Sequence, residues 1–397
     1  MLQREEFIAA WIDHSMPFNA LCRLFGISRQ TGYKLVRQWK SERTVAEKSR
    51  RPKRIPNATR AALVRRILSQ KKQFPLWGPV PLRERLRTLW PNDAWPAAST
   101  IGAILKRHGM VKQRRTRRRA PPRTQPFAKV REPNDVWSVD FKGDFELGNG
   151  RRCYPLTVMD GASRFLLACV AFYEPSLENV YPIFVELFRR YGLPKAIRSD
   201  NGEPFASAAA VAGFTQLSVW WARLSIRLER IDPGEPQQNG RHERMHGTLK
   251  KAACEQPRRS LGWQQRAFDR FVAEYNELRP HQALDLKTPA SLYKPSSRPY
   301  PEQPPQLEYP MADVHRVRSD GTIQLGQRRQ FISTTLAGEP VGLYQLDARY
   351  VEVVYANVLL GLIDLRNNNV NPRSNLVRPR PPHRGRRSTR VSAMSPV

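Results

Sequence analysis

The order of predicted elements between residues 127 and 294 constrains the fold of this chain most strongly. Three strand-like segments come first, at 135–147, 153–159 and 164–172, and the first turn, Gly148-Asn149-Gly150, is typical of a hairpin. A helix with an apolar stripe follows, and then a strand that ends at Asp200. Helices and strands alternate from there on. Successive antiparallel strands followed by helix-linked parallel strands predict a mixed α/β sheet.

An RNase H-like fold has this order of elements, and three acidic residues lie where it would bring them together. Asp140 lies within an apolar strand, Asp200 ends a strand expected to neighbour it, and Glu243 lies on a predicted helix at 236–254. Met245 and Leu249 fall on the opposite side of that helix from Glu243. Two strand carboxylates and a helix carboxylate can therefore converge at one edge of the sheet.

Oxygen ligands without a His/Cys cluster are typical of Mg²⁺ or Mn²⁺, and a pair of such ions is a usual means of cleaving phosphodiesters. We therefore expect Asp140, Asp200 and Glu243 to be catalytic residues and ligands of two Mg²⁺ (or Mn²⁺) ions. Each has an alternative role: a solvated strand residue, an ordinary turn residue and a surface charge, respectively. Asp160 is the rival carboxylate, and its sequence context favours a role in a hairpin turn.

The charge of the chain points to nucleic acid as its partner. Lys+Arg number 67 against 35 Asp+Glu, which gives a net charge of +32 and a field that concentrates polyanions. No apolar stretch approaches the ~18–20 residues of a membrane-spanning helix, and the N-terminus lacks the layout of a signal peptide. The four cysteines are scattered, which favours reduced, buried thiols over a disulfide framework. We expect a cytoplasmic, nucleoid-associated protein without a membrane partner.

Clusters of proline divide the chain, because proline neither continues a helix nor donates to a sheet ladder. The predicted domains are a helix-turn-helix DNA-binding domain at 1–56, a second helix-turn-helix-like domain with a basic arm at 57–119, the RNase H-like catalytic core at 127–294, a small C-terminal β-barrel at 308–368, and a basic Pro/Arg tail at 369–397.

The first domain has the pattern of two helices around a tight turn, at 19–26 and 29–39. Gly26 supplies the turn and Ser28 is expected to cap the second helix. Basic and polar side chains on that helix suit a recognition helix in the major groove. They are Arg29, Gln30, Thr31, Lys34 and Arg37. The alternative is a helical hairpin with a solvated basic face.

The second domain carries apolar helical stripes, and Ser99-Thr100 is expected to cap its third helix. That helix ends in basic residues and a basic arm follows it. The residues expected to contact DNA here are Lys106, Arg107, Arg114, Arg115, Arg117, Arg118 and Arg119. Such an arm can also be simply solvated or a targeting signal, but beside two helix-turn-helix candidates a position along phosphates is favoured.

The segments around the three acids, Ser199-Asp200-Asn201-Gly202 and 236–250 among them, resemble the bacterial insertion-sequence transposases with a retroviral-integrase-type DDE core. The segments 275–284 and Trp77-Gly78-Pro79 also resemble that family, and the match extends over residues 15–294. Glu243 lies 43 positions after Asp200, a longer interval than in many relatives. The zinc module of the retroviral proteins is absent from the sequence pattern, and helix-turn-helix blocks stand in its place.

The resemblance implies a DNA transposase that cleaves element ends and joins them to target DNA. Water attacks a phosphodiester first, and the released 3′-hydroxyl then attacks the target. Arg241, Arg244, Lys250 and Lys251 flank Glu243 and would hold phosphates, although they could also form a solvated helix face. The resemblance further implies a homodimer or larger assembly on double-stranded DNA. A DNA-binding regulator with an unused core and a standalone RNase H-type nuclease are the alternatives.

Overall fold

The structure is a computed structural model that describes residues 2–46, 58–111, 130–207, 210–232, 236–366 and 376–377. Two compact units make up the chain, Met1–Arg60 and Ala61–Val397. None of the helices within the described ranges combines the length and the apolar character that crossing a membrane requires. The basic arm of the second predicted domain and nearly all of the tail lie outside these ranges.

The first unit is a three-helix domain of α1 (Leu2–Ile12), α2 (Phe18–Leu24) and α3 (Arg29–Glu42). The expected turn and cap are confirmed: Gly26 has a φ of +62°, and Ser28 Oγ accepts a hydrogen bond of 3.1 Å from the backbone N–H of Thr31. The sequence interpretation did not single out α1. That helix contributes the buried residues Phe7 and Ile8 to the core beneath α3.

The second unit begins with three helices, α4 (Ala61–Gln73), α5 (Pro79–Leu89) and α6 (Ala98–Arg107), which pack around the fully buried Trp77. The indole Nε1–H of Trp77 donates a 2.6 Å hydrogen bond to Glu274, so this block contacts the block that contains the mixed sheet. The expected cap of α6 is wrong. The helix begins at Ala98, and the capping residue Ala97 has no side chain that could accept a hydrogen bond.

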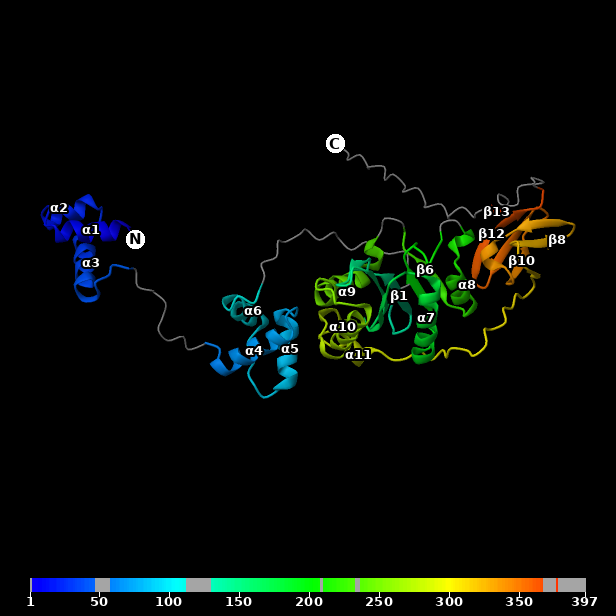
Figure 1. The fold of residues 1–397 in the computed structure, drawn as a ribbon, viewed down its shortest axis with the longest axis horizontal. Helices are drawn as coiled ribbons and strands as arrows, with labels where there is room; N and C mark the ends of the chain where they lie inside the picture. Colours follow the sequence, from blue (N-terminus) through cyan, green and yellow to red (C-terminus); the bar gives the residue numbers. More distant parts are fainter. Residues whose placement is uncertain are drawn as a thin grey trace, which may run out of the picture. The chain divides into compact units, whose positions relative to one another are not determined.

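A mixed sheet forms the centre of the second unit (Figure 1). Its strands are β1 (Val136–Phe141), β2 (Phe145–Glu146), β3 (Arg152–Asp160), β4 (Leu166–Phe172), β5 (Ala196–Ser199) and β6 (Arg227–Arg230). Strands β1, β3 and β4 are antiparallel neighbours, and β5 and β6 join the other side of β1 in parallel. This is the RNase H-like order. The predicted first strand, 135–147, is divided into β1 and β2, with Gly143 at φ +81° between them.

Residues of β1 alternate between two helical layers, as the period of two in a strand requires. Trp137 and Val139 belong to a core with α7 (Leu177–Tyr191) and α8 (Gln216–Arg223). Ser138 and Asp140 therefore face the other way, towards α9 (Gly240–Leu249). The second core, on that face, joins β3 and β4 to α9 and α10 (Leu261–Ala273). The sheet lies between these layers (Figure 1).

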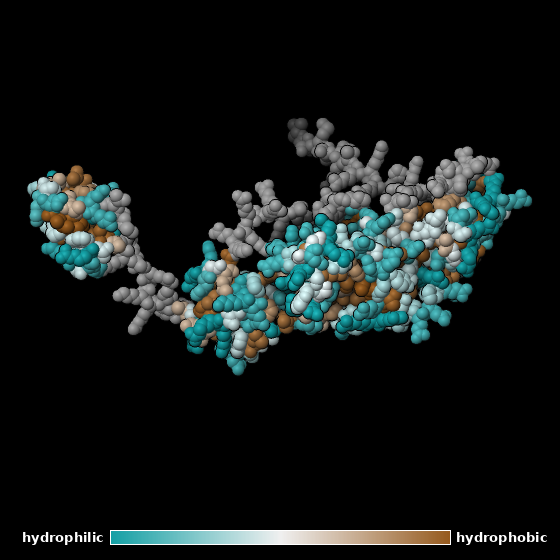
Figure 2. Space-filling view, in the orientation of Figure 1, coloured by the Kyte–Doolittle hydropathy of each residue, from teal (hydrophilic) through white to brown (hydrophobic). Residues whose placement is uncertain are grey.

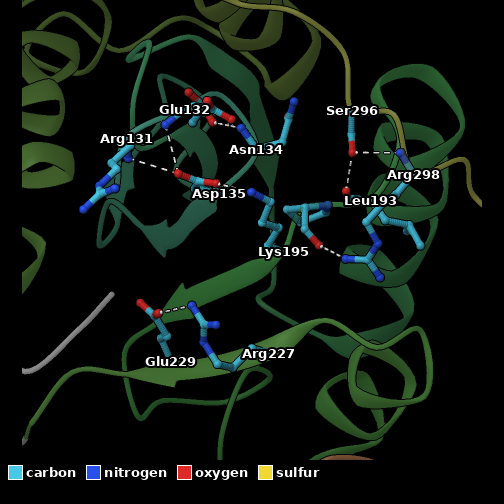
Figure 3. A network of polar contacts seen from close by, with 12 residues as sticks. Arg131, Glu132, Asn134, Asp135, Leu193, Lys195, Arg227, Glu229, Ser296 and Arg298 are labelled. Atoms are coloured by element: carbon cyan, nitrogen blue, oxygen red, sulfur yellow. Dashed lines mark hydrogen bonds and ion pairs between the residues drawn. The ribbon is translucent and has the colours of Figure 1, made fainter. Parts of the chain in front are cut away.

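Several polar contacts anchor β1 and β5 at the ends away from Asp140 and Asp200 (Figure 3). Asp135 accepts hydrogen bonds from the backbone N–H groups of Arg131 and Glu132, at 3.0 and 2.9 Å, and one of 2.8 Å from Lys195 Nζ. Arg298, which follows the last helix of the block, donates a 2.8 Å bond to the carbonyl oxygen of Pro194. These contacts fix the relative position of the two strands that carry the acids.

The remaining described strands form a small β domain. Strands β7 (Asp313–Arg316), β10 (Pro340–Gln345), β11 (Tyr350–Tyr355), β12 (Val358–Asp364) and β13 (Leu376–Val377) make one antiparallel sheet, and β8 (Thr322–Leu325) pairs with β9 (Arg328–Phe331). Both sheets share one core with Phe214 and residues of α8. Hydrophilic residues cover most of the face that Figure 2 presents, with hydrophobic residues visible between the elements.

Candidate active site

Asp140 and Asp200 lie side by side because β1 and β5 run parallel in a defined register. Ser138 pairs with Arg198, and each acid lies two residues further along the chain, Asp140 within β1 and Asp200 directly after the end of β5. Residues two apart point to the same face. Both carboxylates are therefore brought to the carboxyl ends of adjacent strands, on the face that α9 covers. This is the arrangement that the sequence predicted for these two residues.

The three acids influence one another electrostatically. The pKa of Asp140 is raised to about 7, first by burial and then by the Asp200 carboxylate, with a smaller effect of the same sign from Glu243 and an opposing effect from the charge of Lys142. Burial also raises the pKa of Asp200, opposed by the backbone N–H of Gly202. Glu243 is exposed on α9, whose Met245 and Leu249 are buried on the opposite side. A site whose carboxylates repel one another in this way attracts divalent cations.

Two histidines of α9 attach that helix to the sheet directly beneath Asp140. His242 is completely buried, with Nδ1 2.7 Å from Ser138 Oγ and Nε2 2.6 Å from Thr157 Oγ1. His246 Nε2 lies 2.7 Å from the same Thr157 hydroxyl. Burial lowers the pKa of His246 to about 3 and holds the pKa of His242 well below its usual range. Both rings are therefore neutral.

The sequence analysis gave neither histidine a role. The available signal was their i,i+4 spacing, which puts both on one face of a helix. Their partners, Ser138 and Thr157, are far away in the sequence and become neighbours only when β1 pairs with β3. Lys142 is another residue that the sequence interpretation missed, and its charge reaches both Asp140 and His246.

In the part of the chain that the structure describes, neither Asp200 nor Glu243 joins Asp140 in a group of three possible ligand atoms within 4.8 Å of one another. Among the described residues, neither Asp140 nor Asp200 forms an ion pair with a lysine or arginine, although both are substantially buried. Asp140, His242 and His246 offer ligand atoms within 4.8 Å of one another. The residues present therefore fit a metal-binding role, with Asp140 at the centre of the group.

Asp160, the rival carboxylate, has a structural role. It is fully buried, and its oxygens accept hydrogen bonds from the backbone N–H groups of Asn134, Ala162 and Ser163 and from Ser163 Oγ. These bonds close the turn between β3 and β4, as the sequence favoured.

A compact set of elements occupies the long interval between Asp200 and Glu243. It contains α8 and β6, and Phe214 within it packs into the core of the β domain. The interval ends near the active site: Arg198 Nη1 lies 3.4 Å from the carbonyl oxygen of Gln238, immediately before α9. The additional residues thus connect the catalytic block to the β domain while α9 returns to the sheet.

Basic side chains surround α9. Arg244, Lys250 and Lys251 are exposed, whereas one guanidinium nitrogen of Arg241 donates a 2.7 Å bond to the carbonyl oxygen of Gly161. Arg164 lies in the same group: burial, together with the charges of Arg241 and Arg244, lowers the pKa of its guanidinium to about 10. Sequence analysis did not single out Arg164.

The predicted DNA-contacting residues of the N-terminal domains lie on the surface. Every one that the structure describes is exposed, namely Arg29, Gln30, Thr31, Lys34, Arg37, Lys106 and Arg107. The arm residues Arg114, Arg115, Arg117, Arg118 and Arg119 lie outside the described residues. On α3 the exposed side chains are opposite the buried Leu35 and Val36, so the helix presents one polar face.

Comparison with protein families agrees with this architecture. Residues 3–54 match a helix-turn-helix domain, and residues 130–236 and 224–289 match two models of the integrase core domain. The uncharacterized 31.7 kDa protein of insertion element IS407 from Burkholderia multivorans is 32% identical over 181 residues, 45% of this chain and 62% of that protein. The uncharacterized 39.2 kDa protein of IS476 from Xanthomonas euvesicatoria is 26% identical over 72% of this chain and 76% of that protein.

The chain thus spans less than two thirds of the first of these relatives. Among solved structures, the magnesium complex of the HTLV-2 integrase catalytic core is 15% identical, with a TM-score of 0.32, over 41% of this chain and 97% of the other.

The two family matches show that residues 130–289, which carry the two adjacent strand carboxylates, are similar to the integrase core domain. An N-terminal helix-turn-helix domain accompanies that core and marks the chain as DNA-binding. The chain is similar to the proteins of the insertion elements IS407 and IS476.

Proposed function

We propose that the chain is a DDE transposase that cleaves the DNA at the ends of an insertion sequence and joins those ends to target DNA. The observation that carries this proposal is the position of Asp140 and Asp200 at the ends of adjacent parallel strands, within the electrostatic reach of Glu243 on α9. Such a group on a chain of net charge +32 is suited to phosphodiester chemistry on DNA.

Asp140, Asp200 and Glu243 would hold two Mg²⁺ or Mn²⁺ ions. When bound, the ions would activate the attacking oxygen and stabilise the leaving one. Carboxylates on two strands and a helix give the site fixed walls on two sides, while the exposure of Glu243 leaves the third side open to DNA. Burial of the other two acids limits competing water.

Phosphate binding would fall to the basic residues around α9. Arg244, Lys250 and Lys251 are exposed and point outward from the helix whose other side carries Met245 and Leu249. They would hold the backbone on either side of the scissile bond, while the exposed face of α3 would recognise the element ends. Joining both ends in one event requires a homodimer or a larger assembly.

Strand transfer with pre-nicked end DNA and Mg²⁺ tests the proposal. The substrate is DNA from the ends of the genomic element that carries the gene, with a plasmid as target. We expect the wild type to join the ends and Glu243→Gln to bind the same DNA but join none, because the variant keeps the shape of the side chain and loses the charge of a metal ligand. Glu255→Gln is the matched control, since Glu255 is an exposed acid beyond the same helix.

The outcome also separates the alternatives. Cleavage without joining by the wild type would favour a nuclease, and binding without either reaction would favour a DNA-binding regulator. Joining by Glu243→Gln at a rate near that of the wild type would remove Glu243 from the site.

A further inference from the structure

The hydrogen bonds of Thr157 determine which nitrogen of His246 carries the proton. Thr157 Oγ1 contacts three groups: the carbonyl oxygen of Asp140 at 3.0 Å and the Nε2 atoms of His242 and His246. A hydroxyl has one hydrogen to donate, and a carbonyl oxygen can only accept. Thr157 therefore donates to Asp140, and because it has no second hydrogen, His246 Nε2 must donate to Thr157.

With Nε2 of His246 as the donor to Thr157, Nδ1 of that neutral ring carries a lone pair. His242 Nδ1 lies 2.7 Å from Ser138 Oγ, which also donates to the carbonyl oxygen of Met159 at 3.2 Å, so both nitrogens of the His242 ring have hydroxyl partners. His246 Nδ1 has no hydrogen-bond donor among the described residues. It faces the Asp140 carboxylate instead, with Oδ2 3.7 Å away. Two electron-pair donors that face each other at this distance call for a cation between them.

We propose that His246 Nδ1 is a direct metal ligand beside Asp140, so that the metal site contains an imidazole in addition to the three carboxylates. This inference rests on the proposed function and adds to it a ligand that the carboxylate triad does not include. A cation about 2.1 Å from both atoms fits a separation between about 3.0 and 4.2 Å, depending on the angle at the metal. The observed 3.7 Å lies within that range.

His242 is excluded as a ligand although its atoms lie within the same group. Both of its nitrogens are already engaged, and its ring is completely buried between Ser138 and Thr157. Its function is to hold α9, and with it His246 and Glu243, in place against β1 and β3. The two histidines thus share one hydroxyl partner but differ in role.

A nitrogen ligand changes the metal preference of the site. Carboxylate oxygens suit Mg²⁺ and Mn²⁺ alike, whereas imidazole favours the transition metals. The wild-type site should therefore prefer Mn²⁺ to Mg²⁺ more strongly than three carboxylates alone would. Replacing His246 should remove that preference.

Electron paramagnetic resonance of Mn²⁺ bound to the untagged full-length protein tests the assignment, because a directly ligated imidazole nitrogen couples to the Mn²⁺ spin. We expect nitrogen coupling in the wild type, altered by ¹⁵N-histidine labelling and lost in His246→Asn. The affinity for Mn²⁺ relative to Mg²⁺, measured by titration, should fall about tenfold or more in that variant. His242→Asn should retain the nitrogen coupling and lower the affinities for Mn²⁺ and Mg²⁺ by the same factor.

His281→Asn serves as a second control, because this partly buried histidine contacts the carbonyl oxygen of Tyr275 rather than Asp140. It should change neither the coupling nor the metal preference. Nitrogen coupling that is absent from the wild type, or that survives His246→Asn, would overturn the inference. So would an equal loss of Mg²⁺ and Mn²⁺ affinity in His246→Asn, which is the result of a merely structural role.

These results are distinguishable from a failure of the proposed function. A wild-type protein that joins DNA but shows Mn²⁺ without nitrogen coupling would refute the histidine ligand and leave the transposase proposal intact. A protein that binds neither metal at Asp140 and joins no DNA would refute both.

Discussion

Arg198 on β5 and Glu229 on β6 form a buried ion pair two residues before Asp200. Arg198 donates hydrogen bonds of 3.1 Å from Nε and 2.7 Å from Nη2 to one oxygen of Glu229, and Arg227 donates to the other oxygen at 3.0 Å. Because Arg198 also approaches the carbonyl oxygen of Gln238, the pair connects the strand of Asp200 to the segment that leads into α9. The position of two of the three acids thus depends on one guanidinium.

Breaking this pair from one side should destabilise the second unit. Arg198→Met leaves the buried Glu229 with only the half-exposed Arg227 as its cation, and we expect a loss of up to about 3 kcal/mol in the free energy of unfolding, measured by urea titration. The double variant Arg198→Met/Glu229→Leu should recover part of that loss, because no unpaired buried charge remains. A double variant that is no more stable than Arg198→Met would contradict this account.

The sequence was sufficient to predict the positions of Asp140 and Asp200 because both depend on local patterns. The apolar run around each acid predicts a strand, and the order of the elements makes those strands neighbours. The same reasoning located Ser28 as the cap of α3, since capping involves a residue and its third successor. Patterns of this length can be read directly from the chain.

The roles of His242 and His246 could not be predicted in this way. They depend on Thr157, which lies 85 and 89 positions away and reaches them only after β3 has paired with β1 and α9 has packed on both. The prediction that Ser99-Thr100 caps α6 was wrong for a different reason. The helix begins at Ala98, one position before the expected cap, so these hydroxyls lie within the helix. Helix ends are determined by packing as well as by capping residues.

Asp140→Asn should make the metal-free protein more stable at high pH. The pKa of Asp140 is about 7 in the folded state and 3.8 in an unperturbed carboxyl group, so folding favours the neutral form. The contribution of Asp140 to the free energy of unfolding is therefore complete below about pH 4. It is lost as the pH rises to 7, by at most about 4 kcal/mol. The neutral asparagine removes this loss. Thermal denaturation without divalent cations should therefore show that the melting temperature of the variant rises relative to that of the wild type from pH 5 to pH 8.

Asp135→Asn provides a control of opposite sign. Burial acts to raise the pKa of Asp135, but hydrogen bonds from Lys195 and from the backbone of Glu132 and Arg131 outweigh it and lower the pKa. Loss of that carboxylate should destabilise the protein above its normal pKa, at pH 5 as well as at pH 8. If Asp140→Asn behaved like Asp135→Asn, the buried charge of Asp140 would not be a source of instability.

The hydrogen bond between Trp77 and Glu274 should hold the second helical block against the catalytic block. Trp77→Phe keeps the ring in the core but removes the donor, and we expect a loss of about 1.5–3 kcal/mol in unfolding free energy because the acceptor is charged. Trp263→Phe is the matched control, since Trp263 is 56% exposed and its replacement should have almost no effect. Equal, near-zero effects of the two substitutions would show that the bond from Trp77 to Glu274 does not stabilise the protein.

The exposed face of α3 should contribute to DNA binding mainly through phosphate contacts. Lys34→Ala and Arg37→Ala each remove one exposed cation from the helix, and each should reduce the slope of the logarithm of the binding constant against the logarithm of salt concentration by about 0.9. Fluorescence anisotropy on end DNA between low and moderate salt measures that slope. Arg23→Ala on α2 is the control, because Arg23 is an exposed cation outside the predicted recognition helix. A slope that changes with Arg23 but with neither Lys34 nor Arg37 would show that α2, and not α3, lies along the DNA.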